Sequence, residues 1–253
     1  MDLQNQDIRM IVTDLDNTLL RTDETISDYT VSVFRRCRDK GIKIAFATAR
    51  NLLSSAIYRE IIDPDGDIVT GGCLILARTE LLKSIFLPTV QSTMLLNELS
   101  RHPSIKSISA RSLNQAYSSI PIEGRICIDF SSNLPEDLLH CSCRTDDDRY
   151  IKSLANRYDD LSFLHVSDSD LYDINPKEAT KSNGVKIIAE YFKIPLAKVV
   201  AFGDDFNDIS MLKDCGIGIA MGNAIDECKE VADYICDTND NDGMARWLET
   251  YLL

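Results

Sequence analysis

The chain has 253 residues, of which 40 are acidic and 27 are Lys or Arg, so its formal net charge is −13. This length suits one large domain, or a medium domain that carries a smaller one, and 44% hydrophobic residues exclude intrinsic disorder. The negative charge argues against a general binder of nucleic acid or of membrane surfaces, because phosphate groups repel such a surface.

The first part of the chain alternates short apolar runs with amphipathic segments. Buried strands are predicted over 8–13, 43–48 and 67–70, and the last of these ends at Gly71 and Gly72. A helix is predicted over 27–40, with Ser27 as its N-cap and Gly41 as its stop. A second helix is predicted over 51–62.

The final third returns to the same rhythm. Helices are predicted over 177–192, 207–215 and 224–232, and buried strands over 198–202 and 217–221. Buried strands that alternate with helices favour a parallel, doubly wound sheet. The fold class we expect is therefore α/β, with a Rossmann-like core over 1–80 and 176–253.

The middle of the chain has a different character. Strands are predicted over 85–87, 105–109, 125–130 and 162–166, and helices near 91–101 and 147–158. These segments lack the acidic strand ends of the flanking parts. We expect 81–175 to form an inserted α+β domain.

The start of the chain, over 1–7, is polar and acidic, so no signal peptide is expected, and no run approaches the 18 or so apolar residues of a membrane span. We therefore predict a cytoplasmic protein whose eight cysteines stay reduced. Cys141 and Cys143 form the one close pair. A single pair is weak support for zinc, so buried or incidental thiols are favoured.

Polar side chains follow several of the predicted strands. Ligands of open parallel sheets bind beyond the carboxyl ends of the strands, so these residues are candidates for a site. They are Asp14, Asp16 and Thr18 after the first strand, Thr48 and Arg50 after the second, and Asp204, Asp205, Asn207 and Asp208 after the strand over 198–202. Lys181 lies in the first turn of the helix that follows the insertion.

These residue types suit phosphoryl transfer. Carboxylates gathered near one point repel one another unless a divalent cation neutralises them, and oxygen ligands favour Mg²⁺. Lys181 and the Thr48 hydroxyl are suited to hold phosphoryl oxygens. One Asp can attack phosphorus to give an aspartyl phosphate, and a second can protonate the leaving oxygen and then deprotonate water.

Four motifs resemble those of the haloacid dehalogenase-like (HAD) phosphatases. They are Asp14-x-Asp16-x-Thr18, Ala47-Thr48-x-Arg50, Lys181, and Gly203-Asp204-x-x-Asn207-Asp208. Their order and the position of the insertion are similar to the Cof-like branch, in which a large α/β cap domain is inserted. The resemblance covers about 8–80 and 176–253. Within 81–175, only size and position match.

The resemblance implies a role for each motif residue. Asp14 would be the nucleophile and a Mg²⁺ ligand, and Asp16 the general acid and base, whose backbone carbonyl also binds the metal. The remaining implied roles are metal binding by Asp204 and Asp208, and phosphate or substrate binding by Thr48, Lys181 and Asn207. For Arg50, two interpretations stay open: it faces the substrate, or it pairs with a nearby acid.

The sequence departs from the family pattern at three places. Gly71-Gly72 stands where the family often has Asn-Gly, Ala49 replaces a frequent Gly, and Ser182 follows Lys181 where Gly is common. No catalytic group is lost, so these departures bear on substrate preference and leave the expected reaction unchanged.

The function we predict is a Mg²⁺-dependent phosphatase for small phosphomonoesters such as sugar phosphates. A phosphoryl transferase on the same core, such as a sugar phosphomutase, is the alternative. A two-component receiver domain is disfavoured by Asp16 and by the insertion. The expected partner is a small phosphorylated metabolite, with no nucleic acid and no membrane, and the expected state is a monomer or weak homodimer. Arg111, Arg125 and Tyr117 are candidates for selecting the leaving group.

Overall fold

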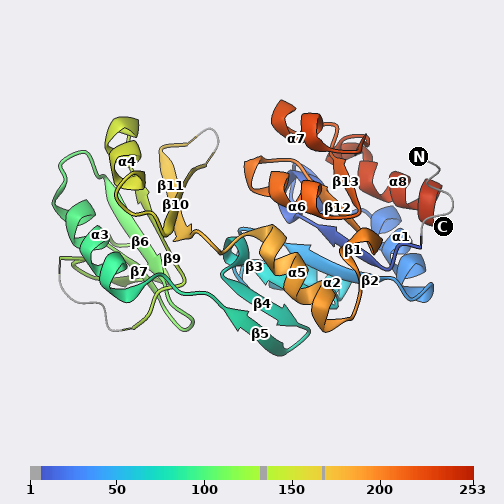
Figure 1. Ribbon diagram of the computed structural model, residues 1–253, viewed down its shortest axis with the longest axis horizontal. Helices are drawn as coiled ribbons and strands as arrows, with labels where there is room; N and C mark the ends of the chain where they lie inside the picture. Colours follow the sequence, from blue (N-terminus) through green and yellow to red (C-terminus); the bar gives the residue numbers. More distant parts are fainter. Residues whose placement is uncertain (1–6, 132–135, 167–168) are drawn as a thin grey trace. The chain divides into compact units, whose positions relative to one another are not determined.

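The computed structural model describes residues 7–131, 136–166 and 169–253 (Figure 1). Its contacts divide the chain into two compact units. The core unit consists of Met1–Lys83 and Thr180–Leu253, and the inserted unit consists of Ser84–Ala179.

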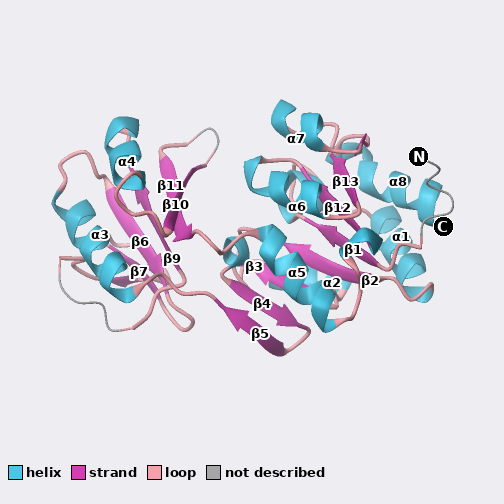
Figure 2. Ribbon diagram, in the orientation of Figure 1, coloured by secondary structure: helices cyan, strands magenta, loops and turns pink. Residues whose placement is uncertain are grey.

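The core unit is built on an eight-stranded sheet (Figure 2). Its strands, in spatial order, are β14 (Tyr234–Ile235), β13 (Ile217–Ala220), β12 (Val199–Gly203), β1 (Met10–Thr13), β2 (Lys43–Ala47), β3 (Gly66–Val69), β4 (Leu74–Ala77) and β5 (Glu80–Ser84). From β14 to β3 neighbouring strands are parallel, so the predicted doubly wound core is confirmed. β4 runs antiparallel to β3.

The order of the strands shows at which edge of the sheet a ligand site is expected. β1 lies between β12 and β2, and it is parallel to both. Thr13, at the end of β1, is in register with Phe202 on one side and with Phe46 on the other. The chain leaves these three strands at one edge, where the direction of winding changes, which is where open α/β sheets bind ligands.

Helices cover this sheet in two groups. In one group, α1 (Asp28–Asp39) packs against α2 (Ala56–Ile62) and α8 (Gly243–Leu252). In the other, α6 (Ile209–Asp214) packs against α5 (Lys181–Tyr191) and α7 (Asp226–Val231). The short turns are η2 (Leu15–Leu19), η3 (Thr70–Gly72), η4 (Leu196–Lys198), η5 (Phe206–Asp208) and η6 (Asn239–Asn241).

Local side chains decide where the helices begin. Ser27 caps α1 as predicted, since its hydroxyl accepts the backbone N–H of Thr30. α2 begins five residues later than predicted, because the Asn51 side chain accepts the backbone N–H groups of Leu53 and Ser54 and holds that segment in a turn. α5 begins at Lys181 and not at 177, because Thr180 is extended and caps the helix.

In its described residues, the inserted unit has a six-stranded sheet and two helices. Its strands, in spatial order, are β10 (Leu161–His165), β11 (Leu171–Pro176), β9 (His140–Arg144), β6 (Ser107–Arg111), β7 (Ala116–Ser118) and β8 (Ile126–Cys127), and its helices are α3 (Thr89–Arg101) and α4 (Asp148–Ala155). All pairs are antiparallel except β7 with β8. The sequence did not predict β7, β9 or β11, and the strand predicted over 85–87 is a loop.

The core of the inserted unit lies between its helices and its sheet. Leu95 and Leu99 of α3 and Leu154 of α4 are fully buried there, together with Cys141 and Cys143 of β9. The two cysteines lie two residues apart on one strand and therefore share a face of the sheet. Both thiols are buried in this core, in keeping with the sequence interpretation.

Candidate active site

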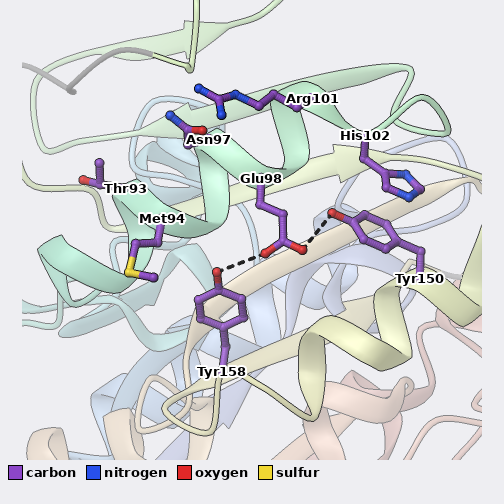
Figure 3. A pocket seen from close by; sticks show the side chains of 8 residues that line it. All are labelled: Thr93, Met94, Asn97, Glu98, Arg101, His102, Tyr150 and Tyr158. Atoms are coloured by element: carbon purple, nitrogen blue, oxygen red, sulfur yellow. Dashed lines mark hydrogen bonds between the residues drawn. The ribbon is translucent and has the colours of Figure 1, made fainter.

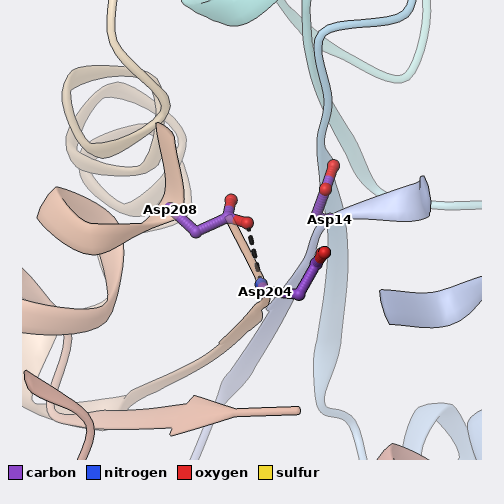
Figure 4. Close-up of side chains that lie close together, drawn as sticks. All are labelled: Asp14, Asp204 and Asp208. Carbon is purple, nitrogen blue, oxygen red and sulfur yellow. Dashed lines mark hydrogen bonds between the residues drawn. The ribbon is translucent and has the colours of Figure 1, made fainter. Parts of the chain in front are cut away.

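Three carboxylates meet at the carboxyl edge of the core sheet (Figure 4). Asp14 directly follows β1, Asp204 directly follows β12, and Asp208 ends the turn η5. Oxygen atoms from all three lie within 4.8 Å of one another, and all three residues are buried. Across the described ranges, no other group of three or more His, Cys, Asp or Glu residues is arranged in this way.

A lysine joins two of these acids. Lys181, at the start of α5, is 1% exposed, and its Nζ lies 2.6 Å from Asp208 Oδ1 and 3.0 Å from Asp14 Oδ1. Burial alone would lower the pKa of Lys181, but the carboxylates of Asp14 and Asp208 outweigh it and hold that pKa above its usual value. The lysine is therefore a fixed cation inside the acidic cluster.

The electrostatics of the cluster are unfavourable for three carboxylates alone. Burial raises the pKa of Asp14 well above its usual value; Lys181 opposes this rise, and Asp208 and Asp204 add to it. Burial, with the charge of Asp208, also raises the pKa of Asp204 to about 7. One lysine does not balance three acids, so a further cation would stabilise the ionised cluster.

Asp208 has little freedom to move. Its Oδ1 accepts a hydrogen bond from Lys181, and its Oδ2 accepts the backbone N–H groups of Asp204, at 3.0 Å, and Asp205, at 3.2 Å. Gly203 leaves room for it, since a Cβ at that position would lie 2.4 Å from the Asp208 Cβ. Asp208 thus fixes both the lysine and the loop that carries Asp204.

The loop after β1 supports the same cluster. Asn17 has a left-handed backbone with φ of 54°, a conformation that Asn tolerates. After this turn, Thr18 Oγ1 donates a hydrogen bond of 2.6 Å to Asp204 Oδ1. The sequence placed Thr18 in a motif but assigned it no partner, and the structure shows that it orients the second acid of the cluster.

Thr48 lies at the end of β2 and is fully buried. Its Oγ1 accepts the backbone N–H of Arg50 at 3.0 Å, and its carbonyl accepts the N–H of Gly71 at 3.1 Å. Gly72 has φ of +105°, and a Cβ there would lie 2.5 Å from the carbonyl oxygen of Thr180. The glycine pair therefore lets this loop approach the start of α5, the helix that carries Lys181.

Asp16 and Arg50 form an ion pair outside the three-acid cluster. Arg50 Nε lies 3.0 Å from both Asp16 oxygens, and its Nη2 lies 2.5 Å from Asp16 Oδ1. Glu24, 3.1 Å from the same Nη2, and Tyr58 complete its surroundings. Of the two interpretations left open by the sequence, pairing with an acid is the one that the structure displays.

Asn207 lies in η5, between Asp204 and Asp208 in the chain. Its side-chain carbonyl oxygen is buried, and the described residues offer it no hydrogen-bond partner. A buried polar atom without a partner is costly, which is consistent with a partner supplied by a ligand or by water.

The inserted unit holds a pocket of about 570 Å³ between α3 and α4 (Figure 3). Glu98 lies within it and accepts hydrogen bonds from the hydroxyl groups of Tyr158, at 3.3 Å, and Tyr150, at 3.4 Å. Arg157 pairs with the same carboxylate. The charge of Glu98 is therefore already balanced within the unit.

Of the three residues named as candidates for leaving-group selection, Tyr117 is 3% exposed and packs in the core of the inserted unit. Arg125 is exposed, and its Nη1 donates to Ser109 Oγ at 2.6 Å. Burial lowers the pKa of Arg111, with a further contribution from the charge of Arg125. The two arginines thus lie within electrostatic reach of each other.

The fold and the site together define a doubly wound α/β protein with a buried acidic centre at the carboxyl ends of its parallel strands. The chain belongs to the haloacid dehalogenase-like hydrolase family, whose pattern it matches over residues 11–248. The family predicted from the four motifs is thereby confirmed, and the protein is a hydrolase of that family.

Relatives match the chain over nearly its whole length. It is 27% identical to the 5-amino-6-(5-phospho-D-ribitylamino)uracil phosphatase YcsE of Bacillus subtilis (strain 168), over 99% of this chain and 98% of the relative. It is 28% identical to YitU of the same organism, which bears the same activity name, over 96% and 97%.

A solved structure shares the fold. It is a phosphatase of the haloalkanoate enzyme superfamily from Bacteroides thetaiotaomicron, with a TM-score of 0.86 and 23% identity over 96% of this chain and 95% of that one. In the described part of this protein, no helix has both the length and the apolar character needed to span a membrane.

Proposed function

We propose that this protein is a Mg²⁺-dependent phosphatase that hydrolyses small phosphomonoesters through an aspartyl-phosphate intermediate. The observation that carries the proposal is the buried cluster of Asp14, Asp204 and Asp208 with Lys181 among them. The names of the Bacillus relatives support phosphatase activity and point to an ester of a sugar-like, ribityl chain as a first substrate to test.

The donor set fits a divalent cation. Three buried carboxylates with one lysine leave the ionised cluster short of positive charge, and carboxylate oxygens are the ligands that Mg²⁺ prefers. Asp14 and Asp204 would hold the ion directly, with the backbone carbonyl of Asp16. Asp208, whose oxygens are occupied by Lys181 and by backbone N–H groups, would support it. When bound, Mg²⁺ would neutralise charge on the transferring phosphoryl group.

The residues of the chain divide the reaction between them. In the first step, a carboxylate oxygen of Asp14 attacks phosphorus, and the bond from phosphorus to the ester oxygen breaks. Asp16 gives a proton to that leaving oxygen, so an alcohol departs. In the second step, Asp16 takes a proton from water as the water oxygen attacks phosphorus. The bond from phosphorus to the Asp14 oxygen breaks, which restores the Asp14 carboxylate and frees inorganic phosphate.

Three further residues would hold the group that is transferred. The Lys181 ammonium and the Thr48 hydroxyl supply donors for phosphoryl oxygens. The Asn207 amide lies in the same loop as Asp204 and Asp208, and its NH2 group would donate to a phosphoryl oxygen. We also propose that the inserted unit acts as a cap that selects the leaving group.

The test is phosphate release from a panel of sugar phosphates, a ribityl phosphate, nucleotides and flavin mononucleotide, with and without Mg²⁺. We expect Mg²⁺-dependent release from several esters. Asp14→Asn should lower kcat by at least about three orders of magnitude while the protein stays folded. Asp39→Asn, which removes an equal charge at an exposed site on α1, is the matched control. An Asp14→Asn variant that retained near-wild-type turnover would refute the nucleophile.

A further inference from the structure

We propose that Arg50 is a positioning residue for the general acid. Its guanidinium group fixes the Asp16 carboxyl apart from the buried acidic cluster, so that Asp16 stays available to protonate the leaving oxygen. This inference rests on the proposed function, since it assigns Asp16 the role of acid in phosphoester cleavage, and it adds a residue that acts only through Asp16.

The contact is a fork that reaches both carboxylate oxygens. Nε lies 3.0 Å from Oδ1 and 3.0 Å from Oδ2, and Nη2 lies 2.5 Å from Oδ1. Contacts of a guanidinium with both oxygens constrain the orientation of a carboxylate more strongly than a single hydrogen bond. The Asp16 side chain is 45% exposed, and the hydrogen bonds that the described residues give it come from Arg50.

The guanidinium itself is held from several sides. Its carbon lies 5.2 Å from the centre of the Tyr58 ring, and Nη1 lies 3.5 Å from the Tyr58 hydroxyl. Nη2 also contacts Glu24 at 3.1 Å. The Arg50 side chain is only 20% exposed, which is low for an arginine near the surface. Arg50 is therefore held in place by contacts that do not involve Asp16.

The backbone of Arg50 is anchored to the site as well. Its N–H donates to Thr48 Oγ1 at 3.0 Å, and its carbonyl accepts the N–H of Thr70 at 2.8 Å. The position of the guanidinium is thus tied to the residue proposed to bind the phosphoryl group. A change in Asp16 orientation would require either this loop or the arginine side chain to move.

The separation of Asp16 from the other acids affects both the repulsion among the carboxylates and the proton transfer by Asp16. A fourth carboxylate turned toward Asp14 would add like-charge repulsion to three buried acids whose oxygen atoms already lie within 4.8 Å of one another. When Asp16 gives its proton to the leaving oxygen, it becomes a carboxylate, and two N–H groups of Arg50 stand ready to hold that charge. Loss of Arg50 should therefore slow the steps in which Asp16 gives a proton, and leave unchanged the steps that need no such proton.

The nature of the leaving group separates this role from a structural one. An alkoxide must be protonated as it leaves, whereas 4-nitrophenolate is stable without a proton. kcat/KM reports the steps up to departure of the alcohol, so it isolates the acid step from the later action of Asp16 on water. A positioning role predicts a defect on alkyl esters with little change on the nitrophenyl ester.

The experiment measures kcat/KM of the wild type and of Arg50→Gln with 4-nitrophenyl phosphate and with the alkyl phosphate that the wild type hydrolyses fastest. We expect a loss of about 10-fold to 100-fold on the alkyl ester, and of less than about 3-fold on the nitrophenyl ester. Asp16→Asn should show the same selectivity, and the double variant should be no worse than Asp16→Asn alone.

Two further variants sharpen the result. Arg50→Lys should recover only part of the alkyl activity, because an ammonium group cannot reproduce the fork. Arg36→Gln removes an exposed ion pair with Glu249 on the surface of α1. It should leave kcat/KM unchanged for both esters. Equal losses on both esters, or a double variant that multiplies the two single losses, would overturn the inference. A wild type that hydrolyses no ester would instead remove the proposed function.

Discussion

Lys181 Nζ lies 2.6 Å from Asp208 Oδ1, and both side chains are almost fully withdrawn from solvent. A buried charge pair of this kind adds little to folding stability relative to apolar residues of the same shape. Removal of one partner is costly, however, because the other charge is left buried and unpaired. The pair therefore couples the stability of the core unit to the chemistry of its site.

We expect Lys181→Met to destabilise the protein by about 3–5 kcal/mol, because buried carboxylates would lose their cation. Mg²⁺ should raise the stability of this variant by more than it raises that of the wild type. Thermal unfolding with and without Mg²⁺ measures both effects. The control is Lys186→Met on the same helix, whose exposed pair with Asp214 should contribute no more than about 1 kcal/mol. Equal losses in the two variants would contradict the prediction.

Asp204→Asn tests the metal site itself. The variant keeps an acceptor for the Thr18 hydroxyl but removes a charge from a crowded cluster. At pH 8, without Mg²⁺, it should be more stable than the wild type, because burial and Asp208 raise the pKa of Asp204 to about 7 and make its ionised form costly. The Mg²⁺ concentration that gives half-maximal activity should rise at least about 10-fold.

The neighbouring acid provides the comparison for this variant. Asp205 caps η5 by accepting the N–H of Phe206, and Asn is an equally good cap. Asp205→Asn removes the same charge one residue away, outside the three-acid cluster. It should leave the Mg²⁺ requirement within about 2-fold of the wild type. A similar shift in both variants would mean that net charge, and not a ligand, sets the requirement.

Gly203→Ala should disturb the site through packing alone. A Cβ at this position would lie 2.4 Å from the Asp208 Cβ and 2.5 Å from its Cγ, so Asp208 or the strand end has to move. We expect a cost of about 1–3 kcal/mol in unfolding free energy and a fall of at least about 10-fold in kcat/KM. Wild-type values for both quantities would show that the loop adapts freely.

The convergence of the acids could be predicted from the sequence because it depends on topology. Asp14 and Asp204 directly follow buried strands, and strand ends in a parallel sheet share one edge. Lys181 could be predicted because it lies in the first turn of a helix. The pairing of Arg50 could not, since the choice between substrate and acid depends on how two loops fold over β1 and β2.

Two of the strands that the sequence did not predict are β9 and β4, and each was missed for its own reason. β9 alternates His140, Ser142 and Arg144 with two small cysteines, so it offers little of the apolar signal that marks a buried strand. The antiparallel strand β4 begins at Leu74, so close to Gly71-Gly72 that no separate strand was predicted there. β9 also depends on pairing with β6 and β11, which are distant in the chain, and a single sequence does not display such pairing.

Asp67, on β3, offers a test of how burial acts on an acid away from the site. Its side chain is fully buried, and Arg59 Nε lies 3.1 Å from its Oδ2, while its Oδ1 has no partner among the described residues. Burial outweighs the attraction of Arg59 and raises the pKa of Asp67 to about 6. In the folded protein this carboxyl therefore holds its proton to a higher pH than it does in the unfolded chain.

The sign of the pH effect follows from proton binding. Between about pH 4 and pH 6 the folded state binds more protons at Asp67 than the unfolded state, so stability falls as the pH rises. Asp67→Asn removes this group. The unfolding free energy of the wild type minus that of the variant should fall by roughly 3 kcal/mol at most over that window and stay level above about pH 7. Urea unfolding from pH 4 to 8 measures it, with Asp63→Asn as the exposed control. A difference that rises with pH would show that the pairing with Arg59, and not burial, dominates at Asp67.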